Sequence, residues 1–145
     1  MTTKLVIGLD GQGSGDRAVA FAKGLADLIG DCELVLVYVI EWSPFSFQTA
    51  EENAQRHKRR EEEIAIANER VVNPAVDALT SEGRSARGIV KHGDVAETLN
   101  AICKAEGGQQ IIVCRSSEGG LASRIFGSST ANLVMSASVP VTVIA

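Results

Sequence analysis

The chain has 145 residues, 45% of them hydrophobic and 22% charged, a composition typical of a single globular domain over residues 1–145. Its formal net charge of −4 provides no basic excess, which argues against nucleic acid or an anionic membrane as a partner. The longest apolar run, Leu34 to Ile40, falls far short of the roughly 20 residues that cross a bilayer.

The cysteines and the N-terminal residues indicate the compartment. Cys32, Cys103 and Cys114 are odd in number and widely spaced, and none has zinc-ligand spacing to a histidine. The opening Met-Thr-Thr-Lys runs directly into a strand pattern, so we expect no signal peptide. These features predict free thiols in a reducing compartment, and therefore a cytoplasmic protein.

The first two predicted strands flank one amphipathic helix. Lys4 to Leu9 is a short β-prone run that ends at a glycine-rich loop from Asp10 to Gly15. Apolar residues at helical spacing predict a helix over Asp16–Ile29. Glu33 to Ile40 is apolar almost throughout, as in strands that are covered on both faces of a parallel sheet.

A long polar helix is predicted from about Glu51 to Thr80, after a loop that carries Trp42, Phe45 and Phe47. Its charged run, residues 57–63, places basic and acidic groups three to four residues apart, which suits intrahelical pairing on a solvated face. Asn73-Pro74 interrupts the helix, and we expect a kink or a break there because proline lacks the amide hydrogen.

The rest of the chain holds three further strands and two helices. The strands are predicted over residues 85–91, 110–114 and 141–144, and the helices over residues 94–106 and 128–136. Asp94 fits a helix N-cap with Glu97 as its reciprocal partner. Five strands that alternate with crossover helices predict an α/β fold: a parallel sheet with helices on both faces.

Two glycine-rich loops leave the carboxyl ends of strands, which is where ligands bind in such sheets. One loop follows the first strand, at Asp10 to Gly15, and the other follows the fourth strand, at Cys114 to Gly127. A strand, a small-residue loop and a helix start form an anion site, because the backbone approaches closely and free N–H groups attract phosphate. With the first and fourth strands as neighbours, we expect both loops to face one crevice.

Over its whole length the chain resembles the universal stress protein family. The resemblance depends on the order and spacing of five short motifs, which are Leu9-Asp10-Gly11, the LVYV of the second strand, Gly93 to Glu97, Gly119 to Ser129 and Val139 to Ile144. It implies a Rossmann-like, adenine-nucleotide alpha hydrolase-like fold with strand order 3-2-1-4-5. It also implies a homodimer formed through the last strand, Val141 to Ile144, whose edge would otherwise expose unpaired backbone groups.

Family members that bind ATP carry glycine, two residues, glycine, nine residues, and then glycine with serine or threonine. When this motif is anchored on Gly127-Ser128, the earlier glycine positions fall on Cys114 and Ser117. A Cβ at these positions would obstruct close approach of the backbone to a ligand, although both replacements are small and Gly119-Gly120 remain. The chain therefore keeps the phosphate end of the motif and lacks its first two glycines.

The resemblance implies ATP, with Mg²⁺, as the ligand and assigns binding roles by position. The carboxylate and neighbouring backbone of Asp10 would meet the adenine or ribose, and the backbone of Val39 would meet the adenine. Arg115 would offset phosphate charge, as would Arg124, which suits a solvated surface equally well. The full set of predicted cofactor-binding residues is Asp10, Gly11, Val39, Cys114, Arg115, Ser117, Gly119, Gly127, Ser128 and Ser129.

Structural roles compete with some of these assignments. Asp10 also suits a strand-end turn, Val39 suits ordinary strand core, and Ser128 suits a plain N-cap. Asp94 and Glu97 fit a cap better than a catalytic role. His57 is expected to be solvated, and a lone histidine at the end of a strand, such as His92, is weak support for a site.

The motifs give little support to catalysis. The chain has neither a Walker lysine after a glycine loop nor a nucleophile elbow, and no carboxylate pair clearly serves as acid and base. We expect no enzyme, or at most a slow incidental ATPase, and no catalytic or resident metal site. The leading hypothesis is a cytoplasmic stress-response or signalling protein that binds ATP as a regulatory ligand and acts on an unidentified protein partner.

Two other hypotheses stay open. The first is a dimeric interaction module of the same fold that binds no nucleotide, which the side chains of Cys114 and Ser117 favour. The second, an ATP-pyrophosphatase-like enzyme, ranks last. That family has an SGGxDS-type loop after the first strand, whereas this loop reads GQGSGDR.

Overall fold

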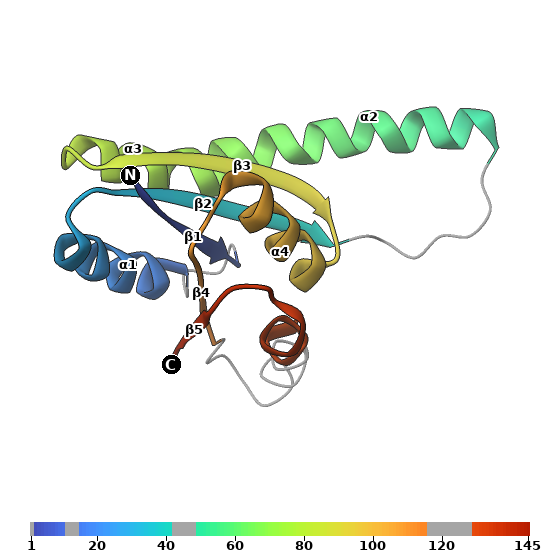
Figure 1. The fold of residues 1–145 in the computed structure, drawn as a ribbon. Coiled ribbons are helices and arrows are strands. Elements are labelled where there is room, and N and C mark those ends of the chain that lie inside the picture. Colours follow the sequence, from blue (N-terminus) through green and yellow to red (C-terminus); the bar gives the residue numbers. More distant parts are fainter. Residues whose placement is uncertain (1, 11–14, 42–48, 116–128) are drawn as a thin grey trace.

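The computed structural model describes residues 2–10, 15–41, 49–115 and 129–145, which form one five-stranded parallel sheet flanked by helices (Figure 1). The strands are β1 (Thr3–Leu9), β2 (Cys32–Glu41), β3 (Ser85–Gly93), β4 (Gln110–Cys114) and β5 (Val141–Ile144). The helical segments are α1 (Gly15–Ile29), α2 (Ala50–Ala67), the π-helical η1 (Asn68–Val72), α3 (Asn73–Ser81), α4 (Val95–Glu106) and residues 129–136.

The strand order is β3-β2-β1-β4-β5, and every neighbouring pair is parallel. The predicted α/β class, the order 3-2-1-4-5 and the helices on both faces are therefore confirmed. The order reverses direction at β1, which lies between β2 and β4. This is the topological switch point at which the ligands of such sheets bind.

Alternation along the central strands divides the core into two clusters. On β2, Leu34 and Leu36 belong to the cluster under α1 and α3, whereas Val35 and Val37 belong to the cluster under α4. Successive side chains of a strand point to opposite faces, so an almost wholly apolar strand is needed when both faces are covered. The apolar run that predicted a two-sided strand is confirmed.

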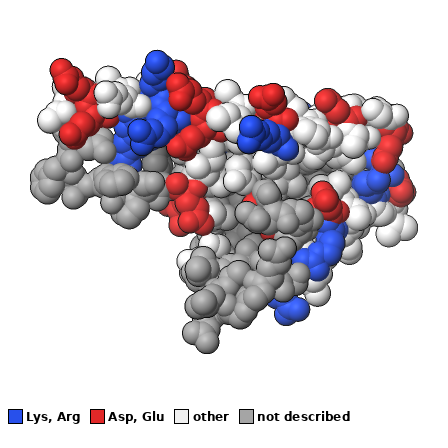
Figure 2. Space-filling model, turned by 180° about the vertical axis from the view of Figure 1, so that it is seen from behind, with Lys and Arg blue, Asp and Glu red and all other residues white. Residues whose placement is uncertain are grey.

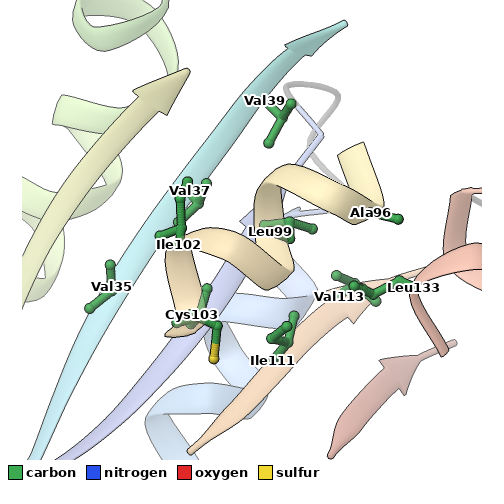
Figure 3. Packing of buried hydrophobic residues seen from close by; sticks show 11 residues of the cluster. Val35, Val37, Val39, Ala96, Leu99, Ile102, Cys103, Ile111, Val113 and Leu133 are labelled. Atoms are coloured by element: carbon green, nitrogen blue, oxygen red, sulfur yellow. The ribbon is translucent and has the colours of Figure 1, made fainter. Parts of the chain in front are cut away.

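Helix α4 covers the face of the sheet that includes Val35, Val37 and Ile111. In Figure 3 the helix lies over the strands, and the side chains of Leu99, Ile102 and Cys103 project from it among these strand residues. Asp94 caps the helix, because its carboxylate accepts the N–H of Glu97 at 3.0 Å. The predicted N-cap is confirmed by this bond, and the reciprocal bond from the Glu97 side chain stays a prediction.

Helix α1 covers the opposite face through a row of small residues. Ala18, Ala22 and Ala26 are buried there against Leu5 and Ile7 of β1. A spacing of four residues places the alanines on one side of a helix, and their size lets the helix approach the sheet closely.

The polar helix stays helical through Asn73-Pro74, so of the expected kink or break the break is absent and the irregularity is a π-helical turn. The chain instead widens into the π-helical η1, in which the N–H of Asn73 donates to the carbonyl of Asn68, five residues earlier. Pro74 is then placed in the first turn of α3, where a missing N–H costs least. The wide turn shifts the hydrogen-bond register just before the proline.

The N-terminus of α2 carries a capping box that our reading of the sequence missed. The hydroxyl of Thr49 accepts the N–H of Glu52 at 3.2 Å, and the Glu52 carboxylate accepts the N–H of Thr49 at 3.1 Å. The signal was present as a threonine followed three residues later by a glutamate.

The surface of α2 mixes charges of both signs, as predicted. His57 pairs with Glu61 at 3.1 Å one turn later, and both side chains are exposed. Figure 2 shows Lys and Arg interspersed with Asp and Glu along the top of the molecule, where α2 lies. This face therefore lacks the single-sign basic patch that nucleic acid would require.

None of the helices in the described residues is long and apolar enough to span a bilayer.

An ion-pair network joins β2, β3 and α4. Arg87 on β3 pairs with Glu33 on β2 at 3.0 Å, and it also pairs with Glu106 in the last turn of α4. The hydrogen bond from Arg87 is the main cause that holds the pKa of the Glu106 carboxyl below its ordinary value of 4.5. The folded state therefore binds this proton less readily than the unfolded chain does.

We predict that this pair stabilises the fold near neutral pH and stops doing so in acid. Because the folded pKa is depressed, the contribution is present above the unfolded pKa and is lost as the pH falls through the folded value. Urea unfolding from pH 7 to pH 3 should show Glu106→Gln less stable than the parent at pH 7, with a difference that shrinks in acid. A difference that is constant with pH would contradict this.

Candidate functional site

The candidate site lies at the carboxyl edge of the sheet, where β1 and β4 end side by side. Ile7 of β1 is in register with Ile112 of β4, so both strands reach this edge together. Asp10 directly follows β1, and Arg115 directly follows β4. The prediction that the two glycine-rich loops start from neighbouring strands at the switch point is confirmed.

Strand β2 extends past the end of β1 and presents backbone to the same edge. Its register with β1 ends at Tyr38, whereas its register with β3 continues to Glu41. Val39 is the first residue of this extension. The residue is 8% exposed and belongs to the cluster under α4, so Val39 has the strand-core role that its sequence context also suggested. An adenine contact by its backbone stays a prediction.

Cys114 ends β4 with its side chain on the α1 face. It is 3% exposed and belongs to the cluster that includes Ala18 and Ile112. Burial is the main cause that raises the pKa of the Cys114 thiol. The charge of Asp10 raises it further, and the charge of Arg17 opposes both. These interactions place a carboxylate, a thiol and a guanidinium together at the carboxyl edge.

Arg17, in the first turn of α1, is a residue at this edge that the sequence analysis missed. Its guanidinium donates to the carbonyl oxygen of Arg115 at 3.2 Å and to the main-chain oxygen of Ala145 at 3.0 Å. The thiol of Cys114 donates to the same Arg115 carbonyl at 3.6 Å. The residue that leads from β4 into the glycine-rich loop is therefore held from α1.

The end of β5 is fixed at the same place. The N–H of Arg115 donates to the carbonyl of Ile144 at 2.7 Å. Between the helix over residues 129–136 and β5, the side chain of Asn100 on α4 accepts the backbone N–H of Ser138 at 3.0 Å. Ser129 is half-buried in the helix over residues 129–136, which Leu133 anchors in the α4-side cluster.

Half of the predicted site residues lie outside the described parts of the chain. These residues are Gly11, Ser117, Gly119, Gly127 and Ser128. Arg124 and the aromatic residues 42–47 lie outside as well. Of the other half, Asp10, Cys114 and Arg115 come together at the ends of β1 and β4, and their ligand contacts stay predictions.

His92 has a more definite structural role than its sequence context suggested. Its side chain is 8% exposed, and Nε2 lies 3.0 Å from a carboxylate oxygen of Glu63 on α2. This contact ties the carboxyl end of β3 to the long helix. Among the residues that the structure describes, no group of three His, Cys, Asp or Glu side chains could hold a metal ion.

Comparison with known proteins matches the whole chain to one family. The model of the Universal stress protein family matches residues 1–145. The solved structure of universal stress protein UspA from Lactobacillus plantarum is 18% identical and covers 99% of this chain and 97% of that chain, with a TM-score of 0.79. A search of curated proteins finds no significant match.

Two further solved structures contain adenine nucleotides. A universal stress protein in complex with cAMP is 19% identical with a TM-score of 0.60, over 99% of this chain and 96% of that chain. The universal stress protein from Archaeoglobus fulgidus in complex with dAMP is 14% identical with a TM-score of 0.57, over 100% and 98%. At such identities the likeness shows a shared fold.

Proposed function

Since this chain belongs to the universal stress protein family, we propose that it binds ATP as a regulatory ligand at the carboxyl edge of its sheet. The observation that carries the proposal is the convergence of Asp10 and Arg115 at the ends of neighbouring strands at the switch point. In this arrangement the adenine lies near Asp10 and the backbone of Val39. The phosphates lie on the loop that begins at Arg115 and leads to the helix containing Ser129.

Two observations support an adenine nucleotide in particular. Similar structures of the family were solved with cAMP and with dAMP. In this chain β2 continues past the end of β1, so backbone at Val39 lies at the carboxyl edge of the sheet, where it suits hydrogen bonds to a base. Mg²⁺ would accompany ATP and neutralise part of its phosphate charge.

We further propose that the chain acts as a cytoplasmic homodimer paired through β5. The strand is at the edge of the sheet, and Val143 on it is exposed. Val134 and Met135, on the helix that precedes β5, are exposed as well. Pairing with a second copy would satisfy backbone groups on the side of β5 that no described strand pairs, and it would cover apolar surface.

The direct test is to denature purified protein and to analyse the supernatant for released nucleotide, alongside calorimetric titration with ATP and Mg²⁺. We expect bound adenine nucleotide, or ATP binding at or below millimolar concentration. If the protein releases no nucleotide and binds no ATP at millimolar concentration, the proposal is wrong.

The double substitution Cys114→Gly with Ser117→Gly separates this proposal from the module that binds no nucleotide. If the parent binds ATP, restoring both glycines should leave the affinity equal or strengthen it, because two Cβ atoms are removed from the motif. Binding that appears only in the double variant would favour the interaction module. Cys32→Gly, at the amino end of β2, is the control for the loss of a cysteine from a strand.

A further inference from the structure

One side chain connects three elements at the candidate site. Arg17 belongs to α1, and it bonds to the Arg115 carbonyl, 98 residues away, and to the main-chain oxygen of Ala145, 128 residues away. Arg115 in turn donates its N–H to Ile144 of β5. The start of α1, the first residue after β4 and the end of β5 are thus joined through one guanidinium.

The position of Arg17 runs against the local preference of a helix. The first turn carries the positive end of the helix dipole, where acidic residues such as Asp16 are favoured and a cation is disfavoured. Strand-end carbonyls offset this cost, because they are hydrogen-bond acceptors that the sheet no longer satisfies. The planar guanidinium offers separate N–H groups in a fixed geometry to two such acceptors, whereas a lysine ammonium is a compact charge without that fixed geometry.

We propose that Arg17 is a positioning residue that couples the start of the nucleotide loop to the β5 edge. It rests on the proposed function, because the loop that begins at Arg115 is taken as the phosphate loop. Arg17 holds the Arg115 carbonyl and the end of β5 in one geometry, so a ligand that fixes the loop also fixes β5. Bound nucleotide then favours pairing at the β5 edge. By linkage, pairing at the β5 edge raises the affinity for nucleotide by the same factor.

The test compares Arg17→Gln and Arg17→Lys with Lys23→Gln. Lys23 is a matched control, since it is a cation of the same helix whose ammonium group pairs with Glu82 at 2.8 Å instead of with the strand ends. Calorimetry should show ATP affinity reduced by about tenfold in Arg17→Gln, by less in Arg17→Lys, and unchanged in Lys23→Gln. Thermal unfolding checks that each variant is folded.

Amide hydrogen exchange then separates coupling from a general structural effect. ATP should slow exchange in β5 (Val141–Ile144) of the parent and of Lys23→Gln, and should leave it unchanged in Arg17→Gln. A merely structural arginine would weaken ATP binding without removing this response. An equal response of β5 in all three proteins would overturn the proposal.

The ligand-free proteins distinguish failure of the coupling from failure of the proposed function. If the parent binds no ATP, the proposed function is wrong. The exchange rate of the Arg115 amide then still tests whether Arg17 holds the two strand ends together. That amide, which donates to Ile144, should exchange at least about fivefold faster in Arg17→Gln than in Lys23→Gln. Equal rates would show that Arg17 does not hold the two strand ends together.

Discussion

Replacement of Gly88 by alanine should destabilise the fold by about 3 kcal/mol. A Cβ at Gly88 on β3 would lie 2.0 Å from Cγ1 of Val72 in η1 and 3.3 Å from Cγ2 of Val76. The first distance is far below any ordinary contact, and Val72 is fully buried, so its side chain or the backbone that carries it would have to shift within a packed core. Urea unfolding of the purified variant measures the loss.

Two further variants establish the cause. Gly24→Ala in α1 is the matched control, because a Cβ there meets nothing within 4 Å, and it should stabilise the helix by about 0.5–1 kcal/mol. Val72→Ala removes the obstructing methyl groups, so the double variant Gly88→Ala/Val72→Ala should lose less stability than the sum of the single variants. Strictly additive losses would contradict a clash between these residues.

The second large effect is expected at Leu99, which should cost about 2–5 kcal/mol when it is truncated to alanine. Leu99 is 2% exposed and lies in the cluster between α4 and the sheet (Figure 3). Its methyl groups also cover Gly8, because a Cβ placed at Gly8 would lie 3.2 Å from Cδ1 of Leu99. Truncation would therefore leave a cavity beneath β1, two residues before Asp10.

Leu28 provides the matched control, since the same leucine-to-alanine change is made on a helix surface. Its side chain is 86% exposed, so Leu28→Ala should change the free energy of unfolding by less than about 0.5 kcal/mol. Equilibrium denaturation of both variants under one set of conditions measures the difference. Similar losses at Leu99 and Leu28 would show that α4 does not depend on Leu99 for its packing.

Local patterns in the sequence predicted most of the secondary structure. The limits of β4 and β5 agree with the predicted ranges 110–114 and 141–144, because each strand is a short apolar run between turn residues. The cap at Asp94 was also predictable from local sequence, since capping depends on residues three apart. The strand order was also predicted correctly, but that prediction came from the family resemblance and not from periodicity.

The junction at Asn73-Pro74 shows where a local rule is incomplete. Proline removes one hydrogen bond of an α-helix, which predicts a kink or a break. The structure shifts the register by one residue in η1 instead, so the helix continues. In this helical path Val72 is buried beside Gly88 of β3 and Leu79 is buried in the α1-side cluster, and no local sequence pattern contains that tertiary packing.

The candidate site also combines features that local sequence predicts with contacts between residues that are distant in the sequence. Sequence patterns were enough to predict the alternation of strands and helices, the two-sided core and the two glycine-rich loops after the first and fourth strands. The bonds from Arg17 to Arg115 and Ala145, and the contact of His92 with Glu63, became evident only in the folded chain. Hydrophobic periodicity and capping act over a few residues, whereas the partner of a polar side chain is whichever distant group the sheet order brings within hydrogen-bond distance.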